Sequence, residues 1–277
     1  MDGRLLVCAT PIGNLSDVTR RVVDALRSAN AIAAEDTRVT RKLLARYDIH
    51  TPLERYDEHT AAQRTPILIE RIAGGETIAL VSDAGPPGIS DPGSLLVDAA
   101  LTGSLTVEVL PGPSAIITAL VASGLPTSAF YFGGFLPRKD GAARKVLSEL
   151  RHLDATLIFY ESPHRTAATL SRMAEELPDR VGAMARELTK VHEEVVRGTL
   201  DEVAANVADR RLKGEVVLLA GPPTPKEAPD VDVEDIRTRI GVKLAEGVSM
   251  RDAVRLVADE ADLPRNLVYE AAHADQD

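Results

Sequence analysis

Residues 82–93 of the chain read Ser82-Asp83-Ala84-Gly85-Pro86-Pro87-Gly88-Ile89-Ser90-Asp91-Pro92-Gly93. This stretch follows an apolar run at residues 77–81, typical of a buried strand, and precedes an apolar, helix-like segment that starts at Ser94. Three glycines and three prolines in twelve residues keep side chains small and restrict the backbone, so a small ligand could approach amide and carbonyl groups closely. A long turn without a ligand has a similar composition, so this loop by itself does not establish a ligand-binding site.

Two further loops of the same kind follow strand-like runs. Ala9-Thr10-Pro11-Ile12-Gly13-Asn14 follows residues 5–8, and Leu110-Pro111-Gly112-Pro113-Ser114 follows residues 107–109. The carboxyl ends of parallel strands meet at one edge of an open α/β sheet, where ligands bind. The three loops therefore predict one shared crevice.

The composition indicates a soluble, globular chain with a large core. Its 277 residues are 44% hydrophobic and long enough for two domains. No apolar segment approaches the ~20 residues that span a bilayer. Pro11, Gly13 and Asn14 interrupt the N-terminal apolar run too early for a signal peptide. We therefore expect a cytoplasmic protein without a membrane partner.

Cysteine and histidine usage indicates neither a disulfide nor a metal site. The single cysteine, Cys8, lies in the first apolar strand and is interpreted as a buried core thiol. The six histidines are scattered, with no pair four residues apart and no cysteine cluster. We therefore expect no metal.

The net charge of −10 argues against a polyanionic partner, but it is unevenly distributed. Residues 226–277 hold 7 basic and 13 acidic side chains, which leaves a net charge of only −4 on residues 1–225. Basic clusters remain at Arg38/Arg41/Lys42/Arg46, Arg138/Lys139/Arg144/Lys145 and Arg210/Arg211/Lys213. Each cluster taken alone is interpreted as a solvated helix face. Because basic clusters remain in a part of the chain with little net charge, the sequence does not exclude an anionic partner.

The pattern of apolar residues predicts two α/β domains and a helical tail. Strands at 4–9, 29–34, 77–82 and 106–110 alternate with helices at 18–28 and 39–46, which predicts a mostly parallel first sheet. Residues 133–141, rich in glycine and charge, are the best candidate domain linker. Strands at 155–160, 180–187, 194–198 and 214–220, with a helix at 165–177, predict a second, mixed sheet.

The tail follows a second candidate linker, which Pro222-Pro223-Thr224-Pro225 and Pro229 mark. Ile236, Ile240 and Leu244 share one helix face, Ser249 is placed to cap a helix at 250–258, and Pro264 to open a last helix. Three short helices bury little alone, so we expect them to dock on another surface. The expected domains are 1–133, 134–222 and 223–277.

Seven motifs in order carry a family resemblance: residues 9–15, 34–38, 82–93, 111–115, 159–165, 185–190 and 213–215. With them the chain resembles the tetrapyrrole-methylase-like superfamily of S-adenosylmethionine-dependent methyltransferases. More narrowly, it resembles the 16S rRNA cytidine 2′-O-methyltransferase family. The resemblance implies two α/β domains with S-adenosylmethionine between them, 16S rRNA or the small ribosomal subunit as partner, and a homodimer. In one departure, Pro86 stands where the family usually has Thr and supplies neither a backbone N–H nor a hydroxyl.

The ligand loops fit a cofactor without phosphate. The chain contains no Gly-x-Gly and no Walker A sequence, so phosphate cradling is unsupported. S-adenosylmethionine offers an adenine edge, ribose hydroxyls and an amino-acid end, which rigid backbone groups suit. The resemblance implies cofactor contacts at Pro11, Gly13, Asp83, Ala84, Gly85, Ser90, Asp91, Pro111, Ser114, Ala115, Leu188 and Gly221.

Methyl transfer to a ribose hydroxyl needs alignment and a group that accepts the hydroxyl proton. The motifs offer four candidates for that group: Asp36, Glu161, Glu187 and Lys190. Arg38 and Arg165 are the candidates for RNA binding.

Each candidate also has a structural interpretation. Asp36 and Ser114 could cap the helices that follow them, and Glu161 could pair with Arg165 four residues later. Glu187 and Lys190 could pair with their neighbours, Arg186 included. Asp83 could satisfy loop amides, and His164 is interpreted as a structural hydrogen-bond donor.

Two other functions remain open. A methyltransferase of the same fold could act on a porphyrinoid or a protein, although aromatic residues make up only 3% of the chain and it has no Trp to line a macrocycle pocket. A ribosome-assembly or RNA-binding protein could keep the fold without catalysis. The ligand loops favour an enzyme.

Overall fold

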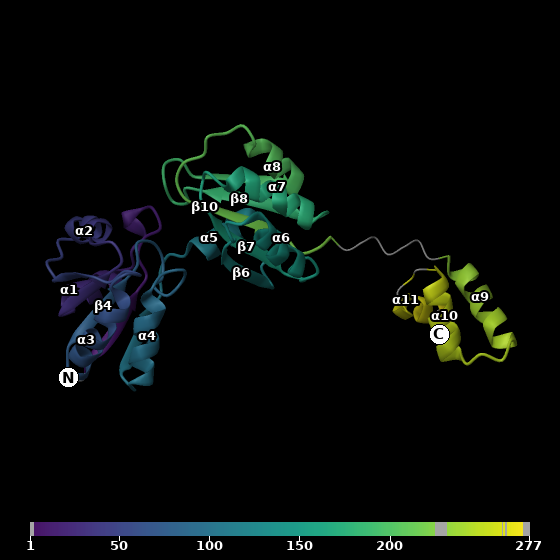
Figure 1. The fold of residues 1–277 in the computed structure, drawn as a ribbon, viewed down its shortest axis with the longest axis horizontal. Helices are drawn as coiled ribbons and strands as arrows, with labels where there is room; N and C mark the ends of the chain where they lie inside the picture. Colours follow the sequence, from purple (N-terminus) through teal and green to yellow (C-terminus); the bar gives the residue numbers. More distant parts are fainter. Residues whose placement is uncertain (1–2, 225–231, 262, 264, 274–277) are drawn as a thin grey trace. The chain divides into compact units, whose positions relative to one another are not determined.

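The computed structural model describes residues 3–224, 232–261, 263 and 265–273 (Figure 1). It divides into two compact units, Met1–Pro223 and Thr224–Asp277. Pro225 and Pro229 of the second predicted linker, and Pro264 at the predicted start of the last helix, lie outside the described residues.

The first unit begins with a parallel five-stranded sheet in the order β3-β2-β4-β1-β5. Its strands are β1 (Arg4–Cys8), β2 (Ala31–Ala34), β3 (Leu53–Arg55), β4 (Thr77–Val81) and β5 (Thr106–Leu110). Its helices are η1 (Leu15–Asp17), α1 (Arg20–Ser28), α2 (Thr37–Arg46), α3 (Ala61–Ala73) and α4 (Gly93–Thr102). The predicted parallel sheet is confirmed.

Alternating side chains bury both faces of this sheet. Leu6 and Cys8 of β1 pack in a core with α1 and α2, whereas Leu5 and Val7 pack in a core with α3 and α4. Because α/β crossovers cover both faces, the inner strands β1, β2 and β4 are mostly apolar and buried, whereas the edge strands β3 and β5 carry Glu54, Arg55 and Glu108. Burial raises the pKa of the Cys8 thiol to about 12, as expected for an inert core cysteine.

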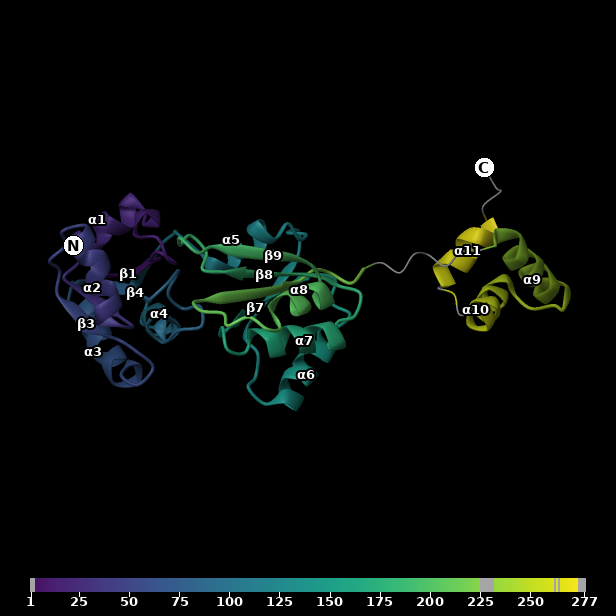
Figure 2. The ribbon, with the colours of Figure 1, turned by 90° about the horizontal axis from the view of Figure 1, so that it is seen from above.

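The second sheet of the same unit has the order β6-β7-β10-β8-β9. Its elements are α5 (Ala115–Ser123), β6 (Phe130–Phe135), α6 (Asp140–Glu149), β7 (Thr156–Glu161), α7 (Thr166–Glu176), β8 (Val181–Arg186), β9 (Glu194–Thr199), α8 (Leu200–Val207) and β10 (Val216–Ala220). Only the β6–β7 pair is parallel, so the predicted mixed sheet is confirmed. Figure 2 shows α5 on one side of the sheet and α6, α7 and α8 on the other.

The linker predicted at residues 133–141 is wrong. Residues 130–135 form β6, which pairs with β7, and α6 begins at Asp140. A Cβ on Gly133 would lie 2.3 Å from Phe159 Cε1, so this glycine permits close packing inside the sheet. Helix α5 also packs on the second sheet, through Ile116, Ala119 and Leu120. We therefore propose that the chain passes between the two sheets at residues 111–114, and not at 133.

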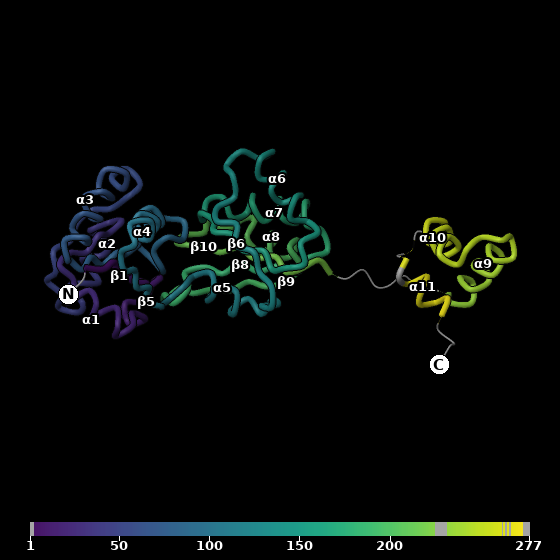
Figure 3. The backbone as a smooth tube through the Cα atoms, turned by 90° about the horizontal axis from the view of Figure 1, so that it is seen from below, coloured from purple at the N-terminus to yellow at the C-terminus, as the bar shows by residue number. Residues whose placement is uncertain are grey.

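The unit Thr224–Asp277 contains α9 (Val233–Ala245), α10 (Met250–Ala261) and α11 (Arg265–His273) (Figure 3). The three helices share a small core of their own: Ile236, Ile240, Ala253, Val254, Val257, Ala258, Val268 and Ala271. Ser249 Oγ accepts the Asp252 amide at 3.2 Å, which confirms the predicted cap. Leu244, expected on the buried face, is 38% exposed, because α9 ends one residue later.

The described residues contain no helix long and apolar enough to cross a membrane. They also contain no group of three or more His, Cys, Asp or Glu side chains placed to hold a metal ion.

Candidate functional site

The three glycine- and proline-rich loops converge, as predicted. The amide of Thr10 donates to Gly85 O at 2.9 Å, and the amide of Gly85 donates back to Thr10 O at 3.0 Å. Gly85 has a φ of +82°, which a residue without a Cβ adopts freely. A Cβ on Gly112 would lie 2.9 Å from Ala9 Cβ, so the loop after β5 also packs closely on the loop after β1.

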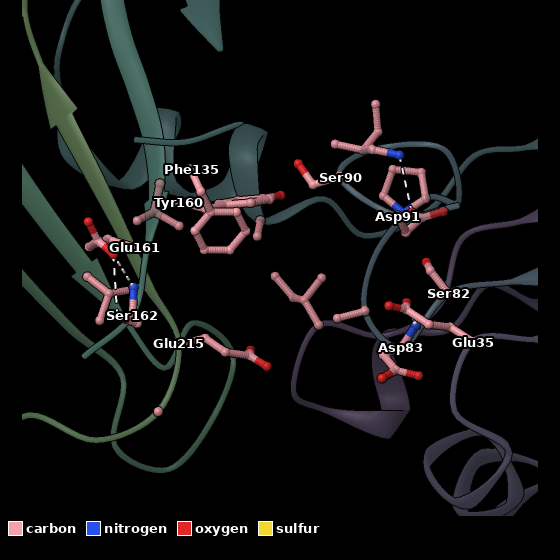
Figure 4. A pocket seen from close by; sticks show the side chains of 18 of the residues that line it. Glu35, Ser82, Asp83, Ser90, Asp91, Phe135, Tyr160, Glu161, Ser162 and Glu215 are labelled. Atoms are coloured by element: carbon pink, nitrogen blue, oxygen red, sulfur yellow. Dashed lines mark hydrogen bonds between the residues drawn. The ribbon is translucent and has the colours of Figure 1, made fainter. Parts of the chain in front are cut away.

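A pocket of about 380 Å³ lies between these loops and the second sheet. Figure 4 shows its two sides facing each other. The labelled residues of the first sheet's loops are Glu35, Ser82, Asp83, Ser90 and Asp91, and those of the second sheet's side are Phe135, Tyr160, Glu161, Ser162 and Glu215. The Tyr160 ring packs against Phe132 and Phe135, with centroids 4.9 and 5.6 Å away.

The charge of the lining is one-sided. Five carboxylates line the pocket, and no lysine or arginine of the described residues does. The same lining includes the apolar side chains of Ile12, Ala115 and Val217. Such a pocket favours a ligand with an apolar or aromatic part and positive charge, and disfavours a phosphate.

Two carboxyl groups in the pocket hold each other's loops. Glu35 Oε2 accepts the Asp83 amide at 3.2 Å, and Asp83 Oδ1 accepts the Asp36 amide at 2.9 Å. Burial, followed by the neighbouring Asp83, Asp91 and Asp36 charges, raises the pKa of Glu35. Burial, with the charges of Asp36 and Glu215, likewise raises the pKa of Asp83. A raised carboxyl pKa is what a general base near neutral pH requires.

A second hollow of about 320 Å³ adjoins the pocket. The two share Ile12, Ser82, Asp83, Ala84 and Glu215 as lining residues. Unlike the pocket, the second hollow is also lined by Lys42 and Lys190. Asp83 therefore stands at the border between an acidic pocket and a hollow with two lysines.

Asp36 caps a helix, one of the two roles predicted for it. It is the N-cap of α2, and its carboxylate accepts the Arg38 amide at 2.8 Å and the Arg38 guanidinium at 2.6 Å. These hydrogen bonds lower the pKa of Asp36 to about 2, which makes it a poor base. Neither Asp36 nor Arg38 lines the pocket, and the Arg38 side chain is 85% exposed.

Glu161 is buried and fully paired, with the partly buried Arg165 as one of its partners. The Glu161 carboxylate accepts the Ser162 amide and the Thr169 hydroxyl, each at 2.7 Å, and lies 3.3 Å from Arg165. Arg165 also donates to the carbonyls of Leu136 and Pro137, which follow β6. Glu161 is therefore placed to hold this wall of the pocket, and not to take a proton from a substrate.

We expect Glu161→Ala to lower the free energy of unfolding by about 3 kcal/mol, because it leaves the Arg165 charge without its buried partner. Glu161→Gln should cost less, since its carbonyl can still accept from Thr169. Urea unfolding of the two variants beside the wild type measures both values. A loss below about 1 kcal/mol for Glu161→Ala would contradict the structural role.

Glu187 and Lys190 are bound to each other. Lys190 Nζ donates to Glu187 Oε1 at 2.8 Å and to Glu215 Oε2 at 3.1 Å. The hydrogen bond from Lys190 lowers the pKa of Glu187. Burial works against the charge of Lys190, but the bonds to Glu187 and Glu215 outweigh it and raise the pKa of Lys190. Both groups therefore stay charged near neutral pH, and neither suits general-base catalysis.

The predicted cofactor residues separate into three groups. The first group lines the pocket: Asp83, Ala84, Ser90, Asp91 and Ala115. Pro86, which stands where the family usually has Thr, lines it as well. Pro11 and Gly13 line the second hollow, where a Cβ on Gly13 would meet Lys190 Cγ at 2.5 Å. The remaining predicted residues line neither space: Gly85, Pro111, Ser114, Leu188 and Gly221.

Several of these residues support the loops instead. Asp91 accepts the amides of Gly88, Ile89 and Gly93, so its carboxylate closes the loop that carries it. Ser114 Oγ accepts the Ile117 amide at the start of α5.

Gly221 lies past the far end of β10 from the pocket, where its carbonyl accepts a hydrogen bond from buried Arg180. The pocket is lined by Val216 and Val217 at the start of that strand. The prediction for Gly221 is not supported, because sequence order does not show at which end of an antiparallel strand the pocket lies.

The lining residues that were not among the predicted site residues include Glu35, Phe135, Tyr160 and Glu215. Glu35, Tyr160 and Glu215 lie inside the quoted motifs, so a signal for them was present. Phe135 had no such signal, because the strand that carries it was interpreted as the start of a linker.

Comparisons with known proteins agree on the family. The family model for Tetrapyrrole (Corrin/Porphyrin) Methylases matches residues 4–204. Curated relatives named "Ribosomal RNA small subunit methyltransferase I" are 43% identical in Synechocystis (97% of this chain, 96% of the relative), 44% in Halalkalibacterium halodurans (98% and 95%) and 42% in Bacillus subtilis (99% and 95%).

Solved structures show the same fold at lower identity. The methyltransferase CobJ aligns with a TM-score of 0.60 and 24% identity over 79% of this chain and 94% of its own. Diphthine synthase aligns with a TM-score of 0.62 and 14% identity over 79% and 89%. Uroporphyrin-III C-methyltransferase from Thermus thermophilus, complexed with S-adenyl homocysteine, aligns with a TM-score of 0.55 and 18% identity over 78% and 97%. The chain therefore belongs to the tetrapyrrole methylase family and, within it, to the branch of the ribosomal RNA small subunit methyltransferases I.

Proposed function

We propose that this chain transfers a methyl group from S-adenosylmethionine to the 2′-hydroxyl of a cytidine in 16S rRNA. The names of the near full-length relatives support the rRNA substrate. The observation that carries the proposal is the carboxylate-lined pocket beside Asp83, which adjoins a hollow lined by Lys42 and Lys190.

The pocket fits S-adenosylmethionine. Its volume of about 380 Å³ lies in the range of small-molecule sites, ~300–1,000 Å³. Phe135, Tyr160 and Val217 offer apolar surface for the adenine, and the carboxylate of Glu35 suits a positively charged sulfonium or ammonium group. When bound, the cofactor supplies an activated methyl group on a neutral leaving group.

The residues of the chain then position and deprotonate the acceptor. Asp83 Oδ1 is held by the Asp36 amide, whereas Oδ2 makes no hydrogen bond to any described residue. We assign Oδ2 as the acceptor of the ribose hydroxyl proton, and the raised pKa of Asp83 favours this role. Lys42 in the second hollow carries a positive charge that suits a neighbouring phosphate, whereas the charge of Lys190 is paired with Glu187 and Glu215.

We propose that residues 224–277 form a separate domain that orients the ribosomal subunit, since they hold their own core. A cytoplasmic location follows from the substrate. A homodimer is supported by exposed apolar side chains at Val109 on the edge strand β5 and at Ile117 and Val121 on α5.

The direct test is transfer of label from methyl-labelled S-adenosylmethionine to purified 30S subunits that lack the modification. We expect labelled 16S rRNA and, after nuclease digestion, 2′-O-methylcytidine by mass spectrometry. A porphyrinoid and a protein extract serve as competing acceptors. Cofactor binding without transfer to rRNA would overturn the proposal in favour of another acceptor or of an assembly factor.

A further inference from the structure

A groove in the unit Thr224–Asp277 carries chemistry that the proposed reaction does not use. It lies along α10 and α11 with a volume of about 890 Å³. We call it the α10–α11 groove and define it by six of its lining residues: Arg251, Asp252, Arg255, Arg265, Tyr269 and His273.

Helical spacing places these side chains away from the core. Arg251 and Arg255 are four residues apart on α10, and Arg265, Tyr269 and His273 follow at the same spacing on α11. The buried residues of these helices, such as Val257 and Val268, belong instead to the shared core. Packing of the three helices against one another therefore leaves the groove uncovered within this unit.

The groove is basic in an acidic segment. Its lining contains three arginines and one aspartate, although residues 226–277 as a whole carry 7 basic and 13 acidic side chains. The acidic residues Glu234 and Asp235 lie elsewhere, in the first turn of α9. The net charge of the segment therefore hides a local site for an anion.

The arginines are available to a ligand. Arg255 lies 3.4 Å from Asp252 and Arg265 lies 3.5 Å from Asp259, with all four side chains at least half exposed. Exposed pairs of this kind contribute little, so exchange for a phosphate costs little. Arg251 has no ion pair within the described part of the chain.

An aromatic platform lies in the same groove. The rings of Tyr269 and His273 stack with centroids 4.2 Å apart, and His273 Nδ1 is 2.8 Å from Tyr269 O, which fixes the histidine. Tyr269 is 55% exposed and contributes nothing to the described core. An exposed ring beside arginines is the combination that binds unpaired bases and their phosphates.

We propose that the α10–α11 groove binds a single-stranded segment of RNA, with its arginines on phosphates and one base stacked on Tyr269. An acidic peptide would use the arginines but would leave the ring without a partner. The choice of RNA rests on the proposed function, because an rRNA methyltransferase must hold its substrate beyond the reacting nucleotide.

The test measures binding of the full chain to a short fluorescent single-stranded RNA at several salt concentrations. Arg251→Ala/Arg255→Ala should weaken binding and reduce the slope of log Kd against log salt by roughly 0.7 for each phosphate that the variant no longer neutralises. Tyr269→Ala should weaken binding roughly tenfold with an unchanged slope, and Tyr269→Phe should restore it. Arg20→Ala/Arg239→Ala, which removes two arginines that pair with Asp24 and Asp235 outside the groove, is the charge-matched control.

The outcomes separate this inference from the proposed function. Thermal melts confirm that each variant is folded. RNA affinity unchanged in both Arg251→Ala/Arg255→Ala and Tyr269→Ala would overturn the inference, even if the wild type methylates subunits. Equal competition by polyglutamate would also overturn it, in favour of an acidic protein partner. RNA binding with these dependences in a chain that transfers no methyl group would support the inference and remove the proposed function.

Discussion

Asp83→Asn is expected to slow methyl transfer to 30S subunits by roughly 10²-fold or more at saturating cofactor. Asparagine keeps the shape of the side chain and can still accept the Asp36 amide, but it cannot take a proton. The loss should appear in kcat, because the missing interaction is made mainly in the transition state. Single-turnover kinetics with labelled cofactor measure it, and calorimetry reports the cofactor affinity separately.

The dependence of activity on pH is a second test of Asp83 as the base. The base form of Asp83 is the carboxylate, so activity falls as the pH drops through its pKa. Burial and the charges of Asp36 and Glu215 raise the pKa of Asp83, which moves this acid limb above the pH expected for an ordinary aspartate. Asp36→Asn removes one of those charges while it still caps α2, so it should shift the limb to lower pH.

Asp24→Asn, on the exposed surface of α1, is the matched control and should leave both kcat and the profile unchanged. The assignment fails if Asp83→Asn keeps turnover within a few-fold of the wild type. The reaction would then depend on alignment alone, with the proton lost to water.

Removal of residues 224–277 is expected to reduce kcat/KM for 30S subunits at least roughly tenfold, equivalent to ~1.4 kcal/mol. The removed unit has its own core, and both sheets and the whole pocket lie in the unit that remains. The loss should therefore arise from substrate placement, while cofactor binding measured by calorimetry stays unchanged.

The matched control for the deletion is the full chain with Arg251→Ala, Arg255→Ala and Tyr269→Ala combined. If the α10–α11 groove provides the placement, this variant should lose most of what the deletion loses. Full activity on subunits after the deletion would show that the unit has no part in recognition. Loss of cofactor affinity would instead show that it supports the pocket.

The sequence by itself determined that the first sheet is mostly parallel and to which family the chain belongs, but it did not indicate β3 (Leu53–Arg55) or α3 (Ala61–Ala73). Alternation of apolar strands and amphipathic helices depends on local periodicity, and the glycine- and proline-rich loops depend on local backbone preference. Both are visible in a single chain, so the parallel sheet and the convergence of the loops at Thr10 and Gly85 were predictable. The ordered motifs carried the family for the same reason, since they are local strings of residues.

Only the tertiary structure decided which carboxyl group can act as the base. Asp36, Asp83 and Glu187 have the same chemistry in the sequence, and contacts between distant segments separate them. Arg38 and Lys190 lower the pKa of Asp36 and Glu187, whereas burial raises that of Asp83.

The tertiary structure also decided which end of a strand faces the pocket and what individual glycines do. Gly133 serves packing against Phe159, not a linker, and Gly221 lies at the wrong end of an antiparallel strand. The local basic groove of an acidic segment also emerges only when α10 and α11 are folded side by side. The burial of a carboxyl group, its ion pairs and the direction of a strand all depend on residues that are close in space but distant in sequence. A single sequence therefore does not show them.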